Sequence, residues 1–442
     1  MADSATPIIY TENPFVLFLK DFGLFFTNLF TDGGLLGIVL PLNTSHATNL
    51  DELYQSWQNA WAVVLHVFLV IAQLFFLASL LPLSIVTPLP ILYFIYVVGV
   101  VIGNRYFTIL LNGRRKPGLF KSNDEYVRGR KVDEHEKWVF INGVAVGKTW
   151  LQANLDKLAL TFRRPIYGIH NQTRGIIFDV LESIIQRDLS YATLDIRQGY
   201  SALFSILNDT NVHKVVLILH SQGAIEGGMA LDWLYATISA TQLSKLEIYT
   251  FGNAANHWNS PSLRTSSNTG AIGEASSTYE GAGQPQRPGS IKDKATTAIR
   301  HIEHYANLHD YVSRGGILHF RPDPDPKAVD APGPVHSNRF VGRSFKYDAS
   351  GHLLNQHYLN YFFHVDSTDP ATGKVVEDNA YMNSLVDMTV FERWDTVQVS
   401  NNEDARTDGT RVKDLSRLWR YRNGDSPDDS QKGPDAGQVQ AG

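Results

Sequence analysis

A stretch of 52 consecutive residues, 53–104, contains no Asp, Glu, Lys or Arg. Such a run is rare outside lipid, because a helix on a soluble protein needs a polar face. Residues 60–81 are long enough for one membrane span, and residues 89–110 for a second. The segment PLSIVTPLP between them carries three prolines, which favour a turn. The sequence therefore predicts a transmembrane helical hairpin within residues 53–111.

Charged residues beside the hairpin predict its orientation. Arg105, Arg114 and further basic residues follow the second span, whereas Asp51 and Glu52 precede the first. By the positive-inside tendency, the chain after residue 111 faces the cytosol. An integral protein of the endoplasmic reticulum or of lipid droplets fits this pattern. Two alternatives stay open: a shallow hairpin within one leaflet, and a buried helical pair in a soluble protein.

The segment before the hairpin, residues 1–52, has an amphipathic part. Phenylalanines and leucines recur at helical spacing from Phe15 to Phe30, with Lys20, Asp21 and Asn28 between them. The pattern predicts a helix. Such a helix either lies in the membrane interface or packs on the globular domain, and the sequence does not separate the two.

The pattern changes from about residue 134, where short apolar strands alternate with helical segments. This alternation is typical of right-handed βαβ units and predicts an α/β domain over residues 134–400, with a mostly parallel sheet. Two polar segments, 259–295 and 401–442, are too poor in apolar residues to build a core, so we expect both to be disordered. The second is broken at most by a short basic amphipathic helix at VKDLSRLWRYR. The expected strands are 138–143, 165–170, 215–219, 246–251 and 299–306, and the expected helices are 149–161, 173–187, 193–208 and 222–239.

Composition argues against several classes of function. The net charge is -5, and there is no basic stripe, so a nucleic-acid partner is not expected. The chain has no cysteine, so it has neither a disulfide nor a thiol nucleophile. His170 and His220 have no partner at metal-ligand spacing, so neither a metal nor another cofactor is expected.

The segment LILHSQGAIEGG, residues 217–228, places Ser221 between an apolar strand and a helix. A serine at such a turn exposes its Oγ above the sheet, as the nucleophile of a G-x-S-x-G motif does. Leu219 replaces the first glycine of that motif, whereas Gly223 keeps the second. The motif alone is weak, because a serine at a helix start is more often only an N-cap.

Other segments supply candidates for the rest of a catalytic site. The N–H of Gln222 and the N–H of Val144, after the strand 138–143, are candidate oxyanion donors. Asp310 follows a late strand and is the candidate acid, with Glu303 as the alternative. The chain has 15 histidines.

The base should follow the acid in the chain. Two histidines in the segment 344–363 meet that condition, and chain order favours His357, with His352 as second choice.

Together NGVAVG, PIYGIHNQTRG, LILHSQGAIEGG, YTFGNAAN, NLHDYVSR and GHLLNQHYL make residues 134–365 resemble the α/β-hydrolase superfamily. The chain looks most like fungal proteins of unknown function that join a membrane-embedded N-terminal part to a lipase-like DUF676-type domain. The resemblance implies an α/β-hydrolase fold and a serine hydrolase, a lipase or carboxylesterase with Ser221 as nucleophile, Asp310 as acid and His357 as base.

A hydrolase held at a bilayer would meet lipid esters, so the expected partners are the lipid bilayer and a lipid ester substrate. Two other functions stay open. One is a catalytically inactive membrane scaffold or lipid-binding protein. The other is an acyltransferase that uses the same triad.

Overall fold

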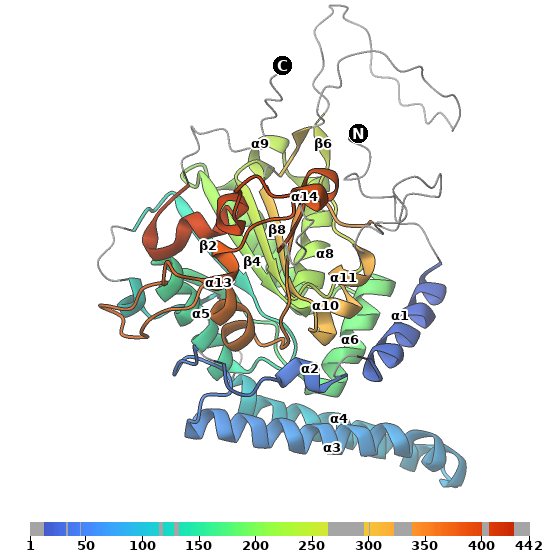
Figure 1. Cartoon of the computed structure of the whole chain (residues 1–442). Helices are drawn as coiled ribbons and strands as arrows, with labels where there is room; N and C mark the ends of the chain where they lie inside the picture. Colours follow the sequence, from blue (N-terminus) through green and yellow to red (C-terminus); the bar gives the residue numbers. More distant parts are fainter. Residues whose placement is uncertain are drawn as a thin grey trace, which may run out of the picture.

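The computed structural model describes residues 13–31, 34–44, 46–114, 118–127, 132–263, 296–299, 301–321, 338–399 and 406–427. Its centre is an eight-stranded sheet in the order β1-β3-β2-β4-β5-β8-β9-β10 (Figure 1). Only β1 is antiparallel to its neighbour. The strands are β1 (Phe120–Lys121), β2 (Glu136–Ile141), β3 (Ile166–Ile169), β4 (Lys214–His220), β5 (Leu246–Phe251), β8 (His301–Asn307), β9 (Arg343–Tyr347) and β10 (Thr396–Gln398), and β6 (Ser262–Leu263) pairs with β7 (Thr296–Thr297) outside the sheet.

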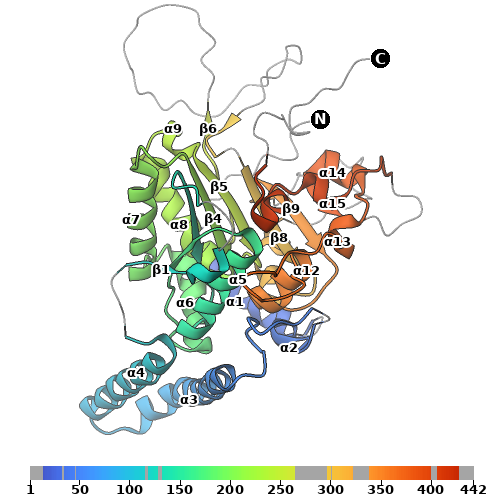
Figure 2. The same ribbon diagram turned by 90° about the vertical axis from the view of Figure 1, so that its left-hand side faces the viewer.

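Helices cover both faces of this sheet, as Figure 2 shows. The helical segments are α1 (Pro14–Leu29), α2 (Leu36–Val39), α3 (Trp57–Val86), α4 (Pro90–Asn112), η1 (Asp124–Val127), α5 (Lys148–Phe162), α6 (Ile176–Leu189), α7 (Leu194–Asn208), α8 (Gln222–Thr237), α9 (Ala240–Leu243), α10 (Tyr311–Gly315), α11 (Ile317–Phe320), η3 (Leu354–Leu359), α12 (Asn360–Phe362), α13 (Ala380–Asn383), α14 (Met388–Trp394), α15 (Val412–Leu415) and η4 (Leu418–Gly424).

Alternate residues of each central strand enter two separate cores. On β4, Val216 and Ile218 join the core beneath α5 and the C-terminal helices, whereas Leu217 and Leu219 join the core beneath α7 and α8. A strand buried on both faces must be apolar throughout, which explains the run KVVLILH. The five strands and four helices expected from the sequence are confirmed as β2, β3, β4, β5 and β8 and as α5 to α8.

The C-terminal part of the chain departs from the prediction. Residues 401–442 were expected to be disordered, but α15 and η4 pack into the core, with Trp419 and Tyr421 buried. Arg417 also donates to buried Glu247 on β5 at 2.8 Å. The prediction is therefore wrong for residues 406–427, because a few large apolar side chains outweigh the polar composition around them. In the insertion expected to be disordered, residues 259–263 are described and end in β6, which pairs with β7. The expected disorder of 264–295, 401–405 and 428–442 lies outside the described residues.

The helical hairpin is present, with longer helices than predicted. Helices α3 and α4 are long and apolar enough to cross a membrane. Helix α3 continues through Pro82, and the turn falls at residues 87–89. Only 28% of the most apolar part of α3 and 11% of that of α4 is buried in the protein, which argues against a pair of core helices. The hairpin lies along one end of the domain (Figure 1), where α3 contacts α5 and α6 and α4 contacts α5.

The predicted amphipathic helix corresponds to α1, which packs against α6 and α10. Leu17 and Asp21 are buried on the packed side, and Asp21 pairs with Arg187 of α6. Phe15 and Phe30 are exposed on the other side. Packing on the globular domain, one of the two expectations, is thus confirmed.

Candidate active site

Ser221 occupies the sharp turn between β4 and α8, at the carboxyl edge of the sheet. Its backbone angles are φ 57° and ψ -125°, a conformation that residues other than glycine rarely adopt. Its N–H donates to the carbonyl of Phe251 on the neighbouring strand at 3.0 Å, which helps to hold the turn. Strain of this kind costs about 1–3 kcal/mol and persists only where the surroundings enforce it.

Leu219 fits into the turn because α8 makes room for it. A Cβ added at Gly227 would lie 2.7 Å from a methyl carbon of Leu219, so the leucine side chain occupies the space that Gly227 leaves. A Cβ at Gly223 would lie 2.4 Å from the carbonyl oxygen of Ile141. The small residues that let helix and strand approach are therefore on the helix, and the missing strand glycine is compensated by Gly227.

The loop between β2 and α5 lies directly against Ser221. A Cβ at Gly143 would come within 2.3 Å of the Ser221 Cβ and 2.9 Å of its Oγ. Val144, one of the two predicted oxyanion donors, follows Gly143 on this loop. Gln222, the other donor, is the first residue of α8, so its N–H has no acceptor within the helix.

Buried side-chain amides tie the ends of β2, β3 and β4 together. The Asn142 Oδ1 accepts from the N–H of Asn171 at 3.0 Å, and Asn171 Nδ2 donates to Gln222 Oε1 at 2.8 Å. Gln222 in turn donates to Gln186 on α6 at 2.8 Å. These groups position the loops on both sides of Ser221. Sequence reasoning missed them, although each of Asn142, Asn171 and Gln222 lies one or two residues after a strand.

Asp310 pairs with His352, not with His357. The His352 Nδ1–H donates to Asp310 Oδ2 at 2.8 Å, and both side chains are buried. The preference for His357 as the partner of Asp310 was therefore wrong, and the second choice has the predicted geometry. Chain order could not separate two histidines five residues apart on one loop. Glu303 lies within β8 and instead bonds His301 and the N–H of Arg417.

His357 holds the loop in place with both ring nitrogens. Its Nδ1 accepts from the N–H of Leu353 at 3.1 Å, so its Nε2 carries the proton and donates to the carbonyl of Pro41 at 2.9 Å. Burial lowers the pKa of His357. Because both ring nitrogens of His357 are engaged in hydrogen bonds, the ring joins residues 351–357, the histidine loop, to the N-terminal segment. It has no lone pair left to accept a proton.

Four donors fix the charged state of Asp310, and one of them, the N–H of Val312, donates to its Oδ1 at 2.9 Å. Besides His352, its Oδ2 accepts from the hydroxyl groups of Tyr358 at 2.6 Å and Ser313 at 2.9 Å. Burial by itself raises the pKa of Asp310, but the His352 ring and the hydrogen bonds outweigh burial, and the pKa lies below its usual value. Asp310 is therefore an anion that holds His352 in the tautomer with Nε2 unprotonated.

The Nε2 atom of His352 is buried and has no hydrogen-bond partner within the described residues. His220 lies beside it, with the two rings stacked at 4.7 Å between centroids, and His220 Nε2 donates to the His352 carbonyl at 2.8 Å. Burial and then the neighbouring His352 lower the pKa of His220 to about 3. A neutral His220 supports the His352 ring without adding a second positive charge.

Gly252, at φ 56°, lies against the pair of Asp310 and His352. A Cβ there would come within 2.9 Å of the His352 Cε1 and 3.1 Å of Asp310 Oδ2. The N-terminal segment covers the same loop, because the N–H groups of Gly351 and His352 donate to the carbonyls of Gly37 and Ile38. Ser221 is only 2% exposed and His352 3%, so the site is closed in this structure.

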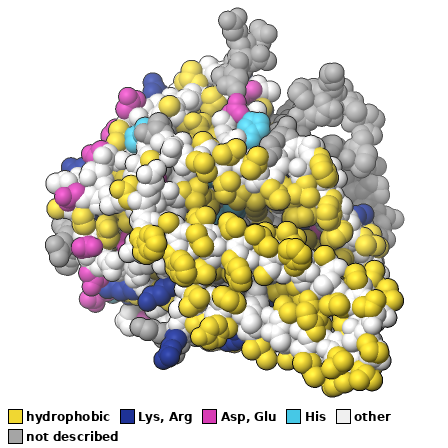
Figure 3. Space-filling view, turned by 90° about the horizontal axis from the view of Figure 1, so that it is seen from below, with side chains coloured by type: hydrophobic (Ala, Val, Ile, Leu, Met, Phe, Trp, Pro, Cys, Tyr) yellow, Lys and Arg dark blue, Asp and Glu magenta, His cyan; other side chains and the backbone are white. Residues whose placement is uncertain are grey.

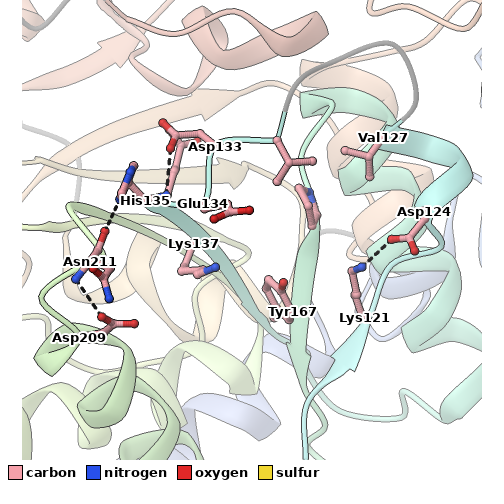
Figure 4. A pocket seen from close by; sticks show the side chains of 13 residues that line it. Lys121, Asp124, Val127, Asp133, Glu134, His135, Lys137, Tyr167, Asp209 and Asn211 are labelled. Carbon is pink, nitrogen blue, oxygen red and sulfur yellow. Dashed lines mark hydrogen bonds and ion pairs between the residues drawn. The ribbon is translucent and has the colours of Figure 1, made fainter.

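A separate pocket opens at the opposite, amino-terminal edge of the sheet (Figure 4). Its volume is about 680 Å³, and charged residues such as Lys137, Glu134 and Asp209 line it. His135 bonds the carbonyl of Asn211 at 2.6 Å across this edge. The pocket has no residue in common with the site at Ser221.

The two histidines that were considered for metal binding both bond backbone carbonyls. His170 Nε2 bonds the carbonyl of Val146 at 3.0 Å, and His220 bonds the carbonyl of His352. Across the described ranges, no group of three His, Asp or Glu side chains could hold a metal ion.

Comparisons with protein-family models, with curated proteins and with solved structures found no match for this chain.

Proposed function

We propose that the protein is a membrane-associated serine hydrolase of α/β-hydrolase fold that cleaves lipid-like esters. The observation that carries this proposal is the pair of Asp310 and His352 at the edge of the sheet where Ser221 occupies its strained turn. A buried carboxylate that fixes the tautomer of a histidine is the arrangement that activates a serine. Strain at a non-glycine residue points in the same direction, because such strain concentrates at functional sites.

The proposed reaction proceeds through an acyl-enzyme. Ser221 Oγ forms a bond to the ester carbonyl carbon while its proton passes to His352 Nε2. The bond from that carbon to the leaving oxygen then breaks, and His352 returns the proton to the departing alcohol. Water repeats the sequence: its oxygen bonds to the acyl carbon, its proton passes to His352, and Ser221 Oγ recovers a proton as the acid leaves.

Asp310 stays ionised throughout this cycle and stabilises the imidazolium form of His352. The N–H groups of Gln222 and Val144 are the proposed donors to the oxyanion, and such a donor contributes about 3–4 kcal/mol to the transition state. The amide chain of Asn142, Asn171 and Gln222 is proposed to hold these two loops at a fixed separation.

No hydrogen bond joins Ser221 Oγ to His352 Nε2 in the closed site. Catalytic hydrogen bonds of this type are often long in the free enzyme and tighten when substrate binds. Residues 34–42 cover the histidine loop, and this cover includes the exposed apolar side chains of Leu36 and Leu42. The outward-facing leucines of this cover suit an apolar, lipid-like substrate. The cover has to move for such a substrate to enter the site.

Labelling with a fluorophosphonate probe tests the proposal directly. We expect the purified full-length protein to react with the probe in detergent or lipid and Ser221→Ala to lose the label. Ser201→Ala, at an exposed serine on α7, is the matched control and should be labelled like the wild type. A folded wild-type protein that does not react, with or without lipid, would contradict the proposal and favour the inactive scaffold.

Acyl transfer uses the same first step, and only the acceptor differs. An ester with a radiolabelled acyl group is incubated with the protein, either in water alone or with an added lipid alcohol. The identity of the labelled product distinguishes hydrolysis from acyl transfer. We expect free fatty acid as the product; a new ester as the main product would replace the hydrolase with an acyltransferase.

A further inference from the structure

The hairpin of α3 and α4 is attached to the domain along its length by polar side chains. Gln73 Nε2 donates to the carbonyl of Arg174 at 2.7 Å, and Gln73 Oε1 accepts from the N–H of Ile177 at 3.2 Å. The second bond satisfies one of the N–H groups that the first turn of α6 leaves without an intrahelical acceptor. Gln73 is therefore an N-terminal cap for a helix of the domain.

Further contacts lie on both sides of Gln73. On α3, Asn59 Oδ1 accepts from the Trp150 indole at 3.1 Å, and Phe76 stacks edge-on against Phe178 of α6. On α4, Asn104 and Asn112 donate to the carbonyls of Arg174 and Thr173. Gln73, Asn59, Asn104 and Asn112 thus face the domain.

The opposite face of the hairpin is apolar and exposed. Val64 is 56% exposed, Phe75 74% and Val86 69%, and Ile102 and Phe94 are similar on α4. Seen from the side of the hairpin, these residues contribute to a broad hydrophobic surface with few charged groups (Figure 3).

The length of the attached part decides how the hairpin can meet a membrane. The contacts from Asn59 to Phe76 cover ~26 Å of α3 at about 1.5 Å per residue. Beyond Phe76 only ~15 Å of helix remains before α3 ends. The hydrocarbon core of a bilayer is ~30 Å thick, so the free end is too short to cross it. Crossing would require Gln73 to leave α6 and to enter lipid, where only its bond to Asn104 of α4, at 2.8 Å, would remain and its Oε1 would have lost the N–H of Ile177.

We propose that α3 and α4 lie in the plane of one leaflet as a monotopic hairpin, with the face of Val64, Phe75 and Val86 in the acyl region. This placement keeps every polar contact to the domain and buries the uncharged face in lipid. It replaces the transmembrane hairpin expected from the sequence with its shallow alternative. The proposal does not depend on the catalytic function of Ser221.

The absence of cysteine from the chain makes single-site labelling straightforward. Val64, Phe75 and Val86 lie within ~40° of one another around α3 but ~33 Å apart along it. Each is replaced by cysteine in the full-length protein and labelled with an environment-sensitive fluorophore. The proteins are reconstituted into phosphatidylcholine vesicles whose acyl chains carry bromine at a shallow or a deep position, and quenching by the two lipids is compared.

An in-plane hairpin gives the same ratio of shallow to deep quenching at all three positions. A spanning hairpin gives shallow quenching at Val64 and Val86 and deep quenching at Phe75, and this result would overturn the proposal. The absence of quenching at all three positions would overturn it too, because another protein surface, such as a second copy of the chain, would then cover the face. Thr241→Cys on α9, at the far end of the domain in Figure 1, is the control that should remain unquenched.

Discussion

The two edges of the sheet differ in ways that bear on where chemistry occurs. The amino edge carries the open, charged pocket of about 680 Å³, whose lining includes the exposed ion pair of Lys121 and Asp124. The carboxyl edge has a closed site, where a strained serine, a buried pair of Asp310 and His352 and a chain of amides interlock. An open pocket is the usual first candidate for a binding site. Backbone strain and buried polar groups are the stronger evidence for a functional site here. Both cost free energy of folding, which a surface without a function does not require.

The largest effect expected at the carboxyl edge comes from His352. We expect His352→Gln to lower ester hydrolysis by about 10⁴-fold or more, because proton transfer from Ser221 is lost. His357→Gln is the matched substitution on the same loop. It should lower the melting temperature, whereas the hydrolysis rate of the protein that remains folded should change little. Hydrolysis rates and melting curves of both proteins measure this, and the reverse pattern would restore His357 as the base.

A smaller effect is expected at Gly252. Gly252→Ala adds a methyl group within 2.9 Å of the His352 ring and 3.1 Å of Asp310 Oδ2. Displacing the ring by a fraction of an ångström should cost about 10²-fold in kcat, with a smaller change in KM. Steady-state kinetics on a soluble ester measure both constants. Unchanged kcat would mean that the position of the His352 ring does not limit the reaction.

The low pKa of His220 predicts a pH dependence of stability. The folded-state pKa of about 3 lies below the usual value of 6.5, so between these values the unfolded chain binds a proton that the folded protein does not. This group therefore removes stability as pH falls from 6.5, by up to about 1.4 kcal/mol per pH unit. The free energy of unfolding of His220→Gln should fall less steeply than that of the wild type over pH 6.5 to 4.5. Equal slopes would show that His220 is protonated in the folded protein.

The smallest effect is expected at the amino edge. Glu134→Gln and Lys137→Gln each remove one charge from the pocket of Figure 4. We expect hydrolysis to be unchanged and the free energy of unfolding to shift by less than about 0.5 kcal/mol, as is usual for surface substitutions. If either variant lost hydrolysis relative to the wild type, the amino edge would also take part in the reaction. The two edges would then not differ in function.

The elements of the parallel sheet could be predicted because strands buried on both faces are continuous apolar runs, as in KVVLILH, and because the helices between them are periodic. Strands β9 and β10 were missed, since β9 reads RSFKY and β10 has only three residues. Composition also misjudged residues 406–427, where five buried side chains anchor a polar segment: Val412, Leu415, Leu418, Trp419 and Tyr421.

At the candidate site, the strand-to-helix turn predicted the position of Ser221 and the loop after a late strand that of Asp310, but chain order did not identify the histidine that pairs with Asp310. His352 and His357 differ in which backbone groups surround them, and those groups come from residues 37–41 and 353, which are distant in sequence from Asp310. The role of Gly227 in accommodating Leu219 was also hidden, because it depends on how the first two turns of α8 cross β4. Such contacts are tertiary, and no local pattern encodes them.

The bond between Glu52 and the N–H of Asn355 has a consequence for biosynthesis. Glu52 Oε1 accepts from Asn355 at 2.9 Å across 303 positions of the chain. At about 5–20 residues per second, ~15–60 s separate the synthesis of the two residues. During that time the hairpin has already left the ribosome and can bind a membrane, whereas the loop that carries His352 does not yet exist. The last part of the candidate site is therefore completed after the hairpin. Under the two proposals above, the chain would reach its membrane before the hydrolase site is complete.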